Sequence, residues 1–131
     1  MILFSATLIV FSAISSAIVD TISFHYNKSI FTKIKNPGYW NPEWSWRNKY
    51  KHYDPKFGER FFQSKDLLVF LTDAWHLFKM LSNTLSWIGF IMLGFNIDSP
   101  LRLILLAIGF KIIHQSVFHL FFTYLLLKKP R

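Results

Sequence analysis

Three long apolar blocks, separated by one long and one short polar connection, set the pattern of this chain. The blocks cover approximately residues 2–24, 67–95 and 101–127, and the long connection covers residues 25–66. A helix that crosses the hydrocarbon core of a membrane needs about 20 mostly apolar residues. The pattern therefore predicts an all-α, polytopic membrane protein with three transmembrane helices, built as a single membrane domain over residues 1–131.

The first block carries small side chains at helical spacing. Small residues on one stripe let two membrane helices approach closely, so we expect a packing seam. The same small residues also resemble the cleavage region of a signal peptide, but no Lys or Arg precedes the apolar core, which favours a retained helix. The stripe consists of Ser5, Ser12, Ala13, Ser16 and Asp20.

The second block, Leu67 to Phe95, is longer than one crossing requires. As a helix it would extend about 43 Å, against about 30 Å for the hydrocarbon core. Splitting it near Asn83 leaves two pieces that are too short to cross, so we expect one tilted or distorted helix that begins near Asp66. At 100° per residue its polar side chains share a face, formed by Thr72, Asp73, His76, Lys79 and Asn83.

Polar residues also interrupt the third block. Lys111, Gln115 and His119 follow i, i+4, i+8 spacing, and His114 lies to one side of them. Because unpaired polar groups are costly in hydrocarbon, we expect the polar faces of the three helices to meet. The expected pairs are Asp73 with Lys111 or Lys79, and Asp20 with His114 or His119.

The centre of the long connection, residues 36–50, combines turn residues with several Trp and Tyr side chains. Trp and Tyr favour the headgroup level of a membrane, so we predict a compact aromatic and basic cap at the interface. Two uses of the cap stay open: simple anchoring to lipid, or a lid that binds an anionic headgroup. The basic side chains of such a lid would be Arg47, Lys49, Lys51 and Arg60.

Charge sets the expected orientation and the expected partners. The chain has 15 Lys and Arg against 7 Asp and Glu, a formal net charge of +8. The basic residues lie mainly in the connection and in the tail 128–131, beside membrane segments, where anionic lipid headgroups explain them without nucleic acid. The positive-inside rule then predicts a cytoplasmic connection and C-terminus, with the N-terminus and the turn at Asp98 outside.

Asp73 and His76 are the strongest candidates for chemistry. An imidazole can act as general acid and base, and a carboxylate can fix its tautomer. We expect His114 and His119 as further catalytic groups, while Asp20, Asn83 and Gln115 would be structural. The expected substrate-binding side chains are Lys79, Lys111, Arg47 and Lys49.

Several kinds of site are excluded or disfavoured. The chain has no cysteine, which excludes disulfides, thiolate catalysis and Cys-ligated metals. No His-x-x-x-His or His-x-x-Glu spacing occurs, so neither a metal nor another cofactor is expected. No Gly-x-Ser-x-Gly frame supports a serine nucleophile.

Two fragments carry a resemblance to known proteins. Thr72-Asp73-x-Trp75-His76-Leu77-x-Lys79, preceded by Ser45-Trp46-x-Asn48-Lys49-Tyr50, resembles small uncharacterised membrane proteins of bacteria and their phages. Asp73-x-x-His76 and Asn83-Thr84-Leu85-x-x-Ile88-Gly89 are similar to fragments of VanZ-like membrane proteins, although here both lie on one helix. That similarity implies action on lipids or lipid-linked headgroups.

Two functions follow as hypotheses. The first is an enzyme that acts on a lipid or lipid-linked anionic headgroup through the Asp, His and Lys site. The second is a homo-oligomer or accessory subunit of a larger membrane complex, or a small proton or ion conductor. A hydrogen-bonded core that only fixes helix register is the structural alternative to both.

Overall fold

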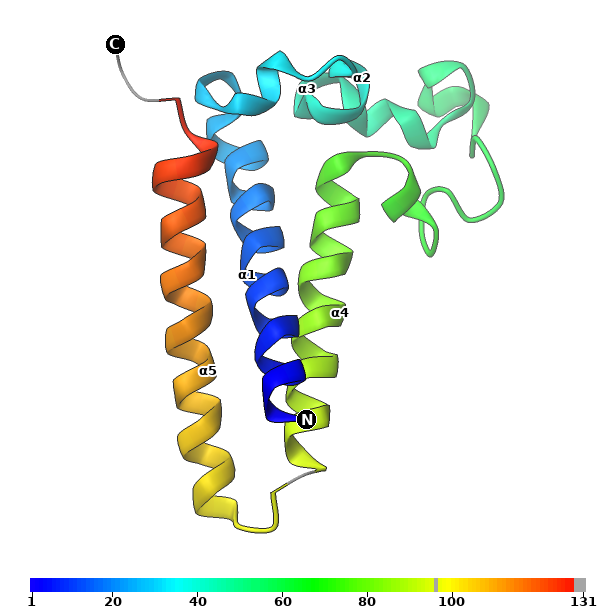
Figure 1. Cartoon of the computed structure of the whole chain (residues 1–131). Coiled ribbons are helices and arrows are strands. Elements are labelled where there is room, and N and C mark those ends of the chain that lie inside the picture. Colours follow the sequence, from blue (N-terminus) through cyan, green and yellow to red (C-terminus); the bar gives the residue numbers. More distant parts are fainter. Residues whose placement is uncertain (96, 129–131) are drawn as a thin grey trace.

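Three long helices form the body of the molecule (Figure 1). The computed structural model describes residues 1–95 and 97–128. Over these ranges its regular secondary structure is helical, with two isolated β-bridges and several turns. The long helices are α1 (Ile2–His25), α4 (Ala74–Gly94) and α5 (Pro100–Leu120), and α5 continues as the π-helical η7 (Phe121–Leu126). Each is long and apolar enough to cross a membrane, which confirms the predicted all-α class with three such helices.

Short helices fill the connection between α1 and α4. Its chain folds as successive single turns at one end of the bundle (Figure 1), so the predicted compact structure is present there. Their bounds are η1 (Tyr26–Lys28), η2 (Ile30–Lys33), α2 (Pro37–Trp40), α3 (Pro42–Ser45), η3 (Trp46–Lys49), η4 (Lys51–Tyr53), η5 (Pro55–Phe57) and η6 (Val69–Leu71).

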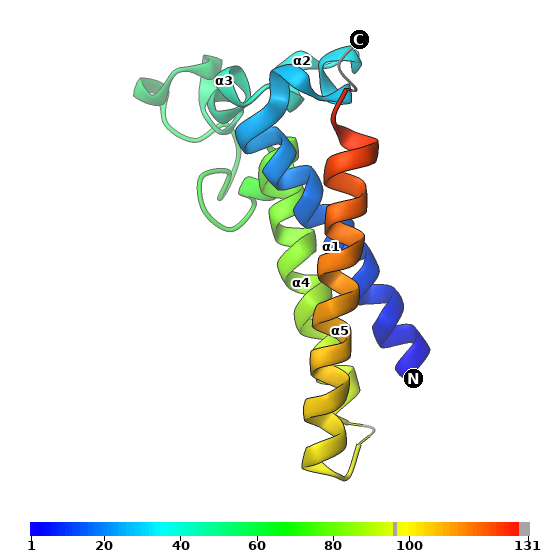
Figure 2. The ribbon, with the colours of Figure 1, turned by 90° about the vertical axis from the view of Figure 1, so that its left-hand side faces the viewer.

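α1 is the central helix, because it packs against both α4 and α5, which contact each other little. Viewed from the side, α1 crosses the other two helices and its first turns diverge from them (Figure 2). Removing α1 would leave α4 and α5 with almost no shared surface.

The serine stripe of α1 faces α4 and confirms the predicted seam. Ser12 Oγ donates to the backbone oxygen of Ser82 at 2.9 Å and contacts Ser86 Oγ at 2.6 Å, so Ser86 is the donor in that second contact. Ser16 and Ser82 share a hydroxyl contact of 2.6 Å. These bonds satisfy hydroxyls that would be unpaired in hydrocarbon, and they are formed within one chain.

Gly89 permits the close approach of α1 and α4 further along the seam. A Cβ placed on it would lie 3.1 Å from Ile9 Cδ1 and 3.3 Å from the backbone oxygen of Ser5. Both Ile9 and Ser5 are fully buried. The seam therefore combines hydroxyl pairs at one level with a glycine contact at another.

α4 begins at Ala74, which corrects the expectation of a helix from residue 67. Residues 62–68 form turns, η6 follows, and Asp73 caps α4 by accepting the backbone N–H of His76 at 2.9 Å. The 21 residues of α4 extend about 31 Å, which matches the hydrocarbon core without tilt or distortion. Thr72 and Asp73 consequently lie before the helix and not on its face.

Lys128, which follows the last helix, is hydrogen-bonded to the connection between α1 and α4. Lys128 donates its backbone N–H to the Lys28 oxygen at 2.8 Å and its Nζ to Thr32 Oγ1 at 2.6 Å. The basic connection and Lys128 thus share one end, and the end of α4 and the start of α5 lie at the other (Figure 1). Asn96 and the tail residues Lys129 to Arg131 lie outside the described residues.

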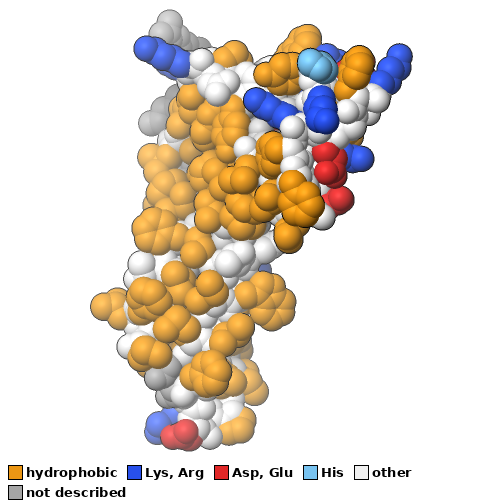
Figure 3. Space-filling model, turned by 90° about the vertical axis from the view of Figure 1, so that its right-hand side faces the viewer, with side chains coloured by type: hydrophobic (Ala, Val, Ile, Leu, Met, Phe, Trp, Pro, Cys, Tyr) orange, Lys and Arg blue, Asp and Glu red, His pale blue; other side chains and the backbone are white. Residues whose placement is uncertain are grey.

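Apolar side chains cover most of the bundle on the face that Figure 3 shows. α5 exposes large aliphatic residues along its length, and Lys and Arg gather at the end that carries the connection. Such a surface suits a hydrocarbon environment between two polar ends. Exposed examples on α5 are Leu101, Ile104, Leu105, Ile108 and Ile112.

Gly89→Val should destabilise the fold, whereas Gly94→Val serves as the matched control on the same helix. A Cβ at Gly94 meets nothing within 4 Å. Overpacking a close contact costs about 1–3 kcal/mol, so thermal unfolding in detergent should show a clearly lower midpoint for Gly89→Val alone. Equal midpoints for the two variants would contradict the close approach of α1 and α4.

Candidate functional site

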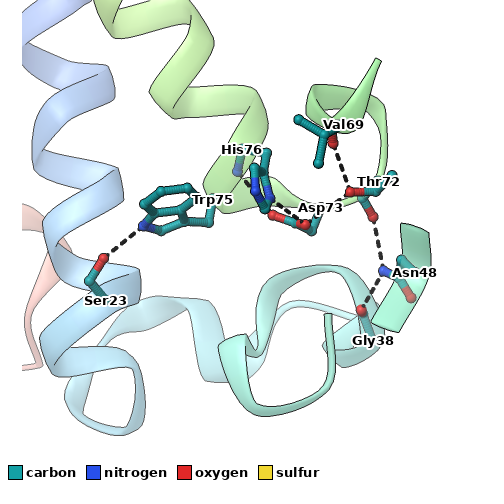
Figure 4. A network of polar contacts seen from close by, with 8 residues as sticks. All are labelled: Ser23, Gly38, Asn48, Val69, Thr72, Asp73, Trp75 and His76. Carbon is teal, nitrogen blue, oxygen red and sulfur yellow. Dashed lines mark hydrogen bonds and ion pairs between the residues drawn. The ribbon is translucent and has the colours of Figure 1, made fainter. Parts of the chain in front are cut away.

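The Asp73 carboxylate and the His76 imidazole form a dyad at the start of α4 (Figure 4). Asp73 Oδ2 lies 2.7 Å from His76 Nδ1, and Oδ1 accepts the backbone N–H of His76. The Asp73 side chain is 2% exposed and that of His76 is 27% exposed. Sequence reasoning predicted this pair and its orienting contact, although it placed the pair inside the helix and not at its N-terminus.

The dyad has a defined tautomer when Asp73 is ionised. A carboxylate oxygen only accepts, so His76 Nδ1 must carry the proton that it shares with Oδ2. The other carboxylate oxygen of Asp73 caps the N-terminus of α4 and is not available to the imidazole ring. Nε2 is then the ring nitrogen left to take or give a proton, and it has no hydrogen-bond partner among the described residues.

Asn48 ties the connection to the residue before the dyad. Its amide group donates to the Thr72 oxygen at 2.9 Å and to the Gly38 oxygen at 2.8 Å. Thr72 Oγ1 lies 2.7 Å from the Val69 oxygen and 3.0 Å from Asp73 Oδ2 (Figure 4). The cap, the turn and the dyad are therefore one hydrogen-bonded unit.

A pocket of about 230 Å³ opens beside the dyad. Its wall includes the aromatic rings of Trp46 and Trp75, and Trp75 is held by a 2.8 Å hydrogen bond from Nε1 to Ser23 Oγ on α1. The ring of Trp75 contacts that of His76 edge-on at 4.8 Å between centroids. The lining residues are Ser23, Pro42, Ser45, Trp46, Asp73, Trp75 and His76.

The geometry favours proton transfer in a small, mainly apolar space. An imidazole with one nitrogen fixed by a carboxylate and the other open is the arrangement of a general acid and base. Ser23 is an unsuitable nucleophile, because its hydroxyl accepts from Trp75 and donates to the Val19 oxygen at 2.8 Å. The dyad can therefore act on a hydroxyl or water supplied from outside the chain.

The negative charge of Asp73 also affects Tyr39, a residue of the cap. Burial, and secondly the negative charge of Asp73, raise the pKa of the Tyr39 phenol above its ordinary value. Both causes favour the neutral phenol. Tyr39 also lines a second pocket on the far side of Thr72, together with Arg47 and Arg60.

The three polar faces do not converge as expected. Lys79 and Asn83 are exposed on α4, and the polar stripe of α5 points outward. Across residues 1–95 and 97–128 the only ion pair is Asp73 with His76, so the expected pairs of Asp73 with Lys111 or Lys79 are wrong. Periodicity had shown which side chains share a face, but not the direction of that face. The exposed residues on α5 are Lys111, Gln115 and His119.

His114 and Asp20 are also separate from the dyad. His114 lines a cavity of about 80 Å³ with Ser86 and Lys111, and its buried Nδ1 has no partner among the described residues. Asp20 is half-buried on α1 and forms no ion pair with His114 or His119. Neither residue lies in the wall of the dyad pocket.

Among the predicted substrate-binding residues, Arg47 and Lys49 differ. Arg47 lines the second pocket, whereas Lys49 places its Nζ 5.6 Å from the Tyr50 ring centre and lies outside both pocket walls. Sequence reasoning gave Ser23 and Asn48 no role, because their contacts join segments far apart in the chain. The Trp75-His76 sequence gave the one local signal for an aromatic wall.

No candidate metal cluster occurs among the His, Asp and Glu residues that the structure describes.

Raising the pH above 10 should weaken the fold through Tyr39. A phenol whose pKa is higher in the folded state stabilises the fold below the unfolded pKa of about 10, and this contribution is lost as the pH rises through the folded value. We expect the unfolding midpoint of Tyr39→Phe to fall less between pH 8 and pH 11 than that of wild type. The exposed Tyr124→Phe is the control, and identical pH profiles for all three proteins would contradict the assignment.

In comparisons with known proteins, no family model matches the chain, and neither a curated protein nor a solved structure matches it.

Proposed function

We propose that this is a small integral membrane enzyme that acts on an anionic lipid or lipid-linked headgroup, with His76 as general acid and base. The observation that carries the proposal is the 2.7 Å contact between Asp73 and His76 on the wall of a pocket at the capped end of the bundle. A dyad there would meet headgroups and not acyl chains. Asp73 is the positioning residue that fixes the imidazole.

The placement in the membrane rests on the three apolar helices and their exposed aliphatic surface. With those helices in hydrocarbon, the cap lies at headgroup level, where its Trp and Tyr rings are favoured. The positive-inside rule puts this end in the cytoplasm and the N-terminus outside. The hydrogen bonds of Lys128 to Lys28 and Thr32 keep the connection and Lys128 on the same side.

The chemistry that suits this site is hydrolysis or transfer at a headgroup phosphate. A water or alcohol oxygen attacks phosphorus while its proton passes to His76 Nε2. The resulting imidazolium, held by the Asp73 carboxylate, returns a proton to the oxygen that departs. Proton transfer of this kind contributes about 10²- to 10⁴-fold to the rate of an enzyme. His114, His119 and Lys111 have no part in it, because they lie on α5 away from the pocket wall.

A second candidate function is assembly with another copy through α5. Lys111, Gln115 and His119 form an exposed polar stripe on an otherwise apolar span. Polar groups in hydrocarbon favour contacts between helices. The serines of α1 are not available for this purpose, because Ser5 and Ser12 are fully buried within the chain.

His76→Gln and Asp73→Asn should each abolish headgroup conversion. Asn caps helices as well as Asp does, so Asp73→Asn should retain the start of α4 while removing the charge. We expect a loss of about 10²- to 10⁴-fold for each. The measurement is headgroup release from phosphatidylglycerol in nanodiscs that contain the purified protein, followed by mass spectrometry.

His119→Gln is the control for that experiment, since His119 is exposed on α5 and should leave the rate unchanged. Equal conversion by wild type and the folded His76→Gln variant would refute the role of the dyad.

Replacing Lys111, Gln115 and His119 together by Leu tests the second candidate. If the stripe joins two copies, the wild type should be dimeric in mild detergent and the triple variant monomeric by light scattering coupled to size exclusion. A control with Leu at Ile104, Ile108 and Ile112 should remain dimeric. A monomeric wild type would exclude this interface.

A further inference from the structure

A second pocket, of about 570 Å³, lies in the cap on the other side of the Thr72-Asp73 step. Thr72 lines this pocket, whereas Asp73 lines the dyad pocket. Asn48 lines it too, and its amide donates to the Thr72 oxygen. The two pockets therefore share a wall that consists of the residues just before α4.

Two arginines, Arg47 and Arg60, line this pocket, and no acidic residue does. Within the described part of the chain neither guanidinium forms an ion pair. An arginine that faces a cavity with no carboxylate partner keeps its N–H donors available for an anion.

Aromatic rings lie within cation–π distance of both guanidinium groups. The Cζ atom of Arg47 lies 5.2 Å from the ring centre of Trp44 and 5.3 Å from that of Trp46. The Cζ atom of Arg60 lies 5.7 Å from the ring centre of Tyr53. A cation above an aromatic ring is attracted to the ring face, and the N–H groups of a guanidinium can bind phosphate oxygens in a forked manner.

The backbone around Tyr53 is strained in the way that functional loops often are. His52 and Tyr53 have positive φ values of 52° and 59°, which side-chain-bearing residues rarely adopt. The loop is closed by hydrogen bonds from Lys51 N to the Gly58 oxygen at 3.1 Å and from Arg60 N to the Lys49 oxygen at 2.9 Å. This closure brings Arg60 back over Tyr53.

We propose that this pocket binds the phosphate group of an anionic headgroup between Arg47 and Arg60. The inference deepens the proposed function, on which it rests for the idea that the bound phosphate belongs to an anionic headgroup, recognised across the shared wall from the dyad. The binding itself depends only on the two arginines and their aromatic supports. A lipid headgroup and free phosphate offer the same chemistry to the site, and the experiment distinguishes them.

The test is a titration of the full-length protein in dodecyl maltoside, with isothermal calorimetry as the readout. The two probes are dihexanoyl phosphatidylglycerol and inorganic phosphate. Arg47→Gln with Arg60→Gln should weaken binding at least tenfold. The matched control is Lys56→Gln with Lys65→Gln, which removes two exposed charges from the same connection and should change binding less than twofold.

A third double variant, Arg47→Lys with Arg60→Lys, retains the charge and protects the test against misfolding. It should bind more weakly than wild type, because Lys cannot form the forked contact. Equal weakening of the Gln variant and the lysine control would overturn the site and indicate diffuse attraction. If the protein binds dihexanoyl phosphatidylglycerol but not inorganic phosphate, the pocket is a headgroup site. If it binds both probes equally, the pocket is a phosphate site without lipid preference.

The His76→Gln variant separates this inference from the proposed function. It should bind the lipid probe as wild type does, since His76 lies outside the pocket wall. Loss of conversion in His76→Gln together with unchanged binding in the arginine variant would refute the phosphate site alone. Unchanged conversion in His76→Gln together with weakened binding in the arginine variant would refute the role of the dyad alone.

Discussion

The carboxylate of Asp73 is the interaction on which both ends of the structure depend. One oxygen caps α4 and the other holds His76 and receives Thr72, so a single group ends the connection, starts a helix and orients an imidazole. This explains how a nearly buried acid is tolerated at the edge of an apolar span: hydrogen-bond donors and the helix N-terminus surround its charge. The same contacts restrict His76 to one proton arrangement.

Periodicity and length predicted the helices well, because crossing a membrane demands a long apolar run and little else has that pattern. The start of α4 escaped prediction because Thr72-Asp73, a good capping pair, lies within the apolar block and was read as part of a polar helix face. The Asp73 and His76 pair was predictable from three-residue spacing. The contacts of Asn48 and Trp75 were not, since they join segments that only the folded chain brings together.

The outward stripe on α5 shows a second limit of sequence reasoning. Spacing placed Lys111, Gln115 and His119 on one face, and the high cost of polar groups in hydrocarbon suggested an inward direction. The direction is decided by packing instead: α1 fills the middle of the bundle with small residues, and α5 contacts it through Phe110 and neighbouring apolar side chains. A helix that touches its neighbours along one narrow strip leaves most of its circumference free.

The hydroxyl groups of α1 have a consequence for how the protein is made. Thr7, Ser15, Thr21 and Ser23 each donate to the carbonyl four residues earlier, which satisfies a hydroxyl without any neighbouring helix. Ser12 and Ser16 would have the same option in a separate α1. In the folded protein they bond to Ser82 and Ser86 of α4 instead. Most hydroxyl groups of α1 therefore have an acceptor within the helix itself, before the chain of the cap and α4 follows.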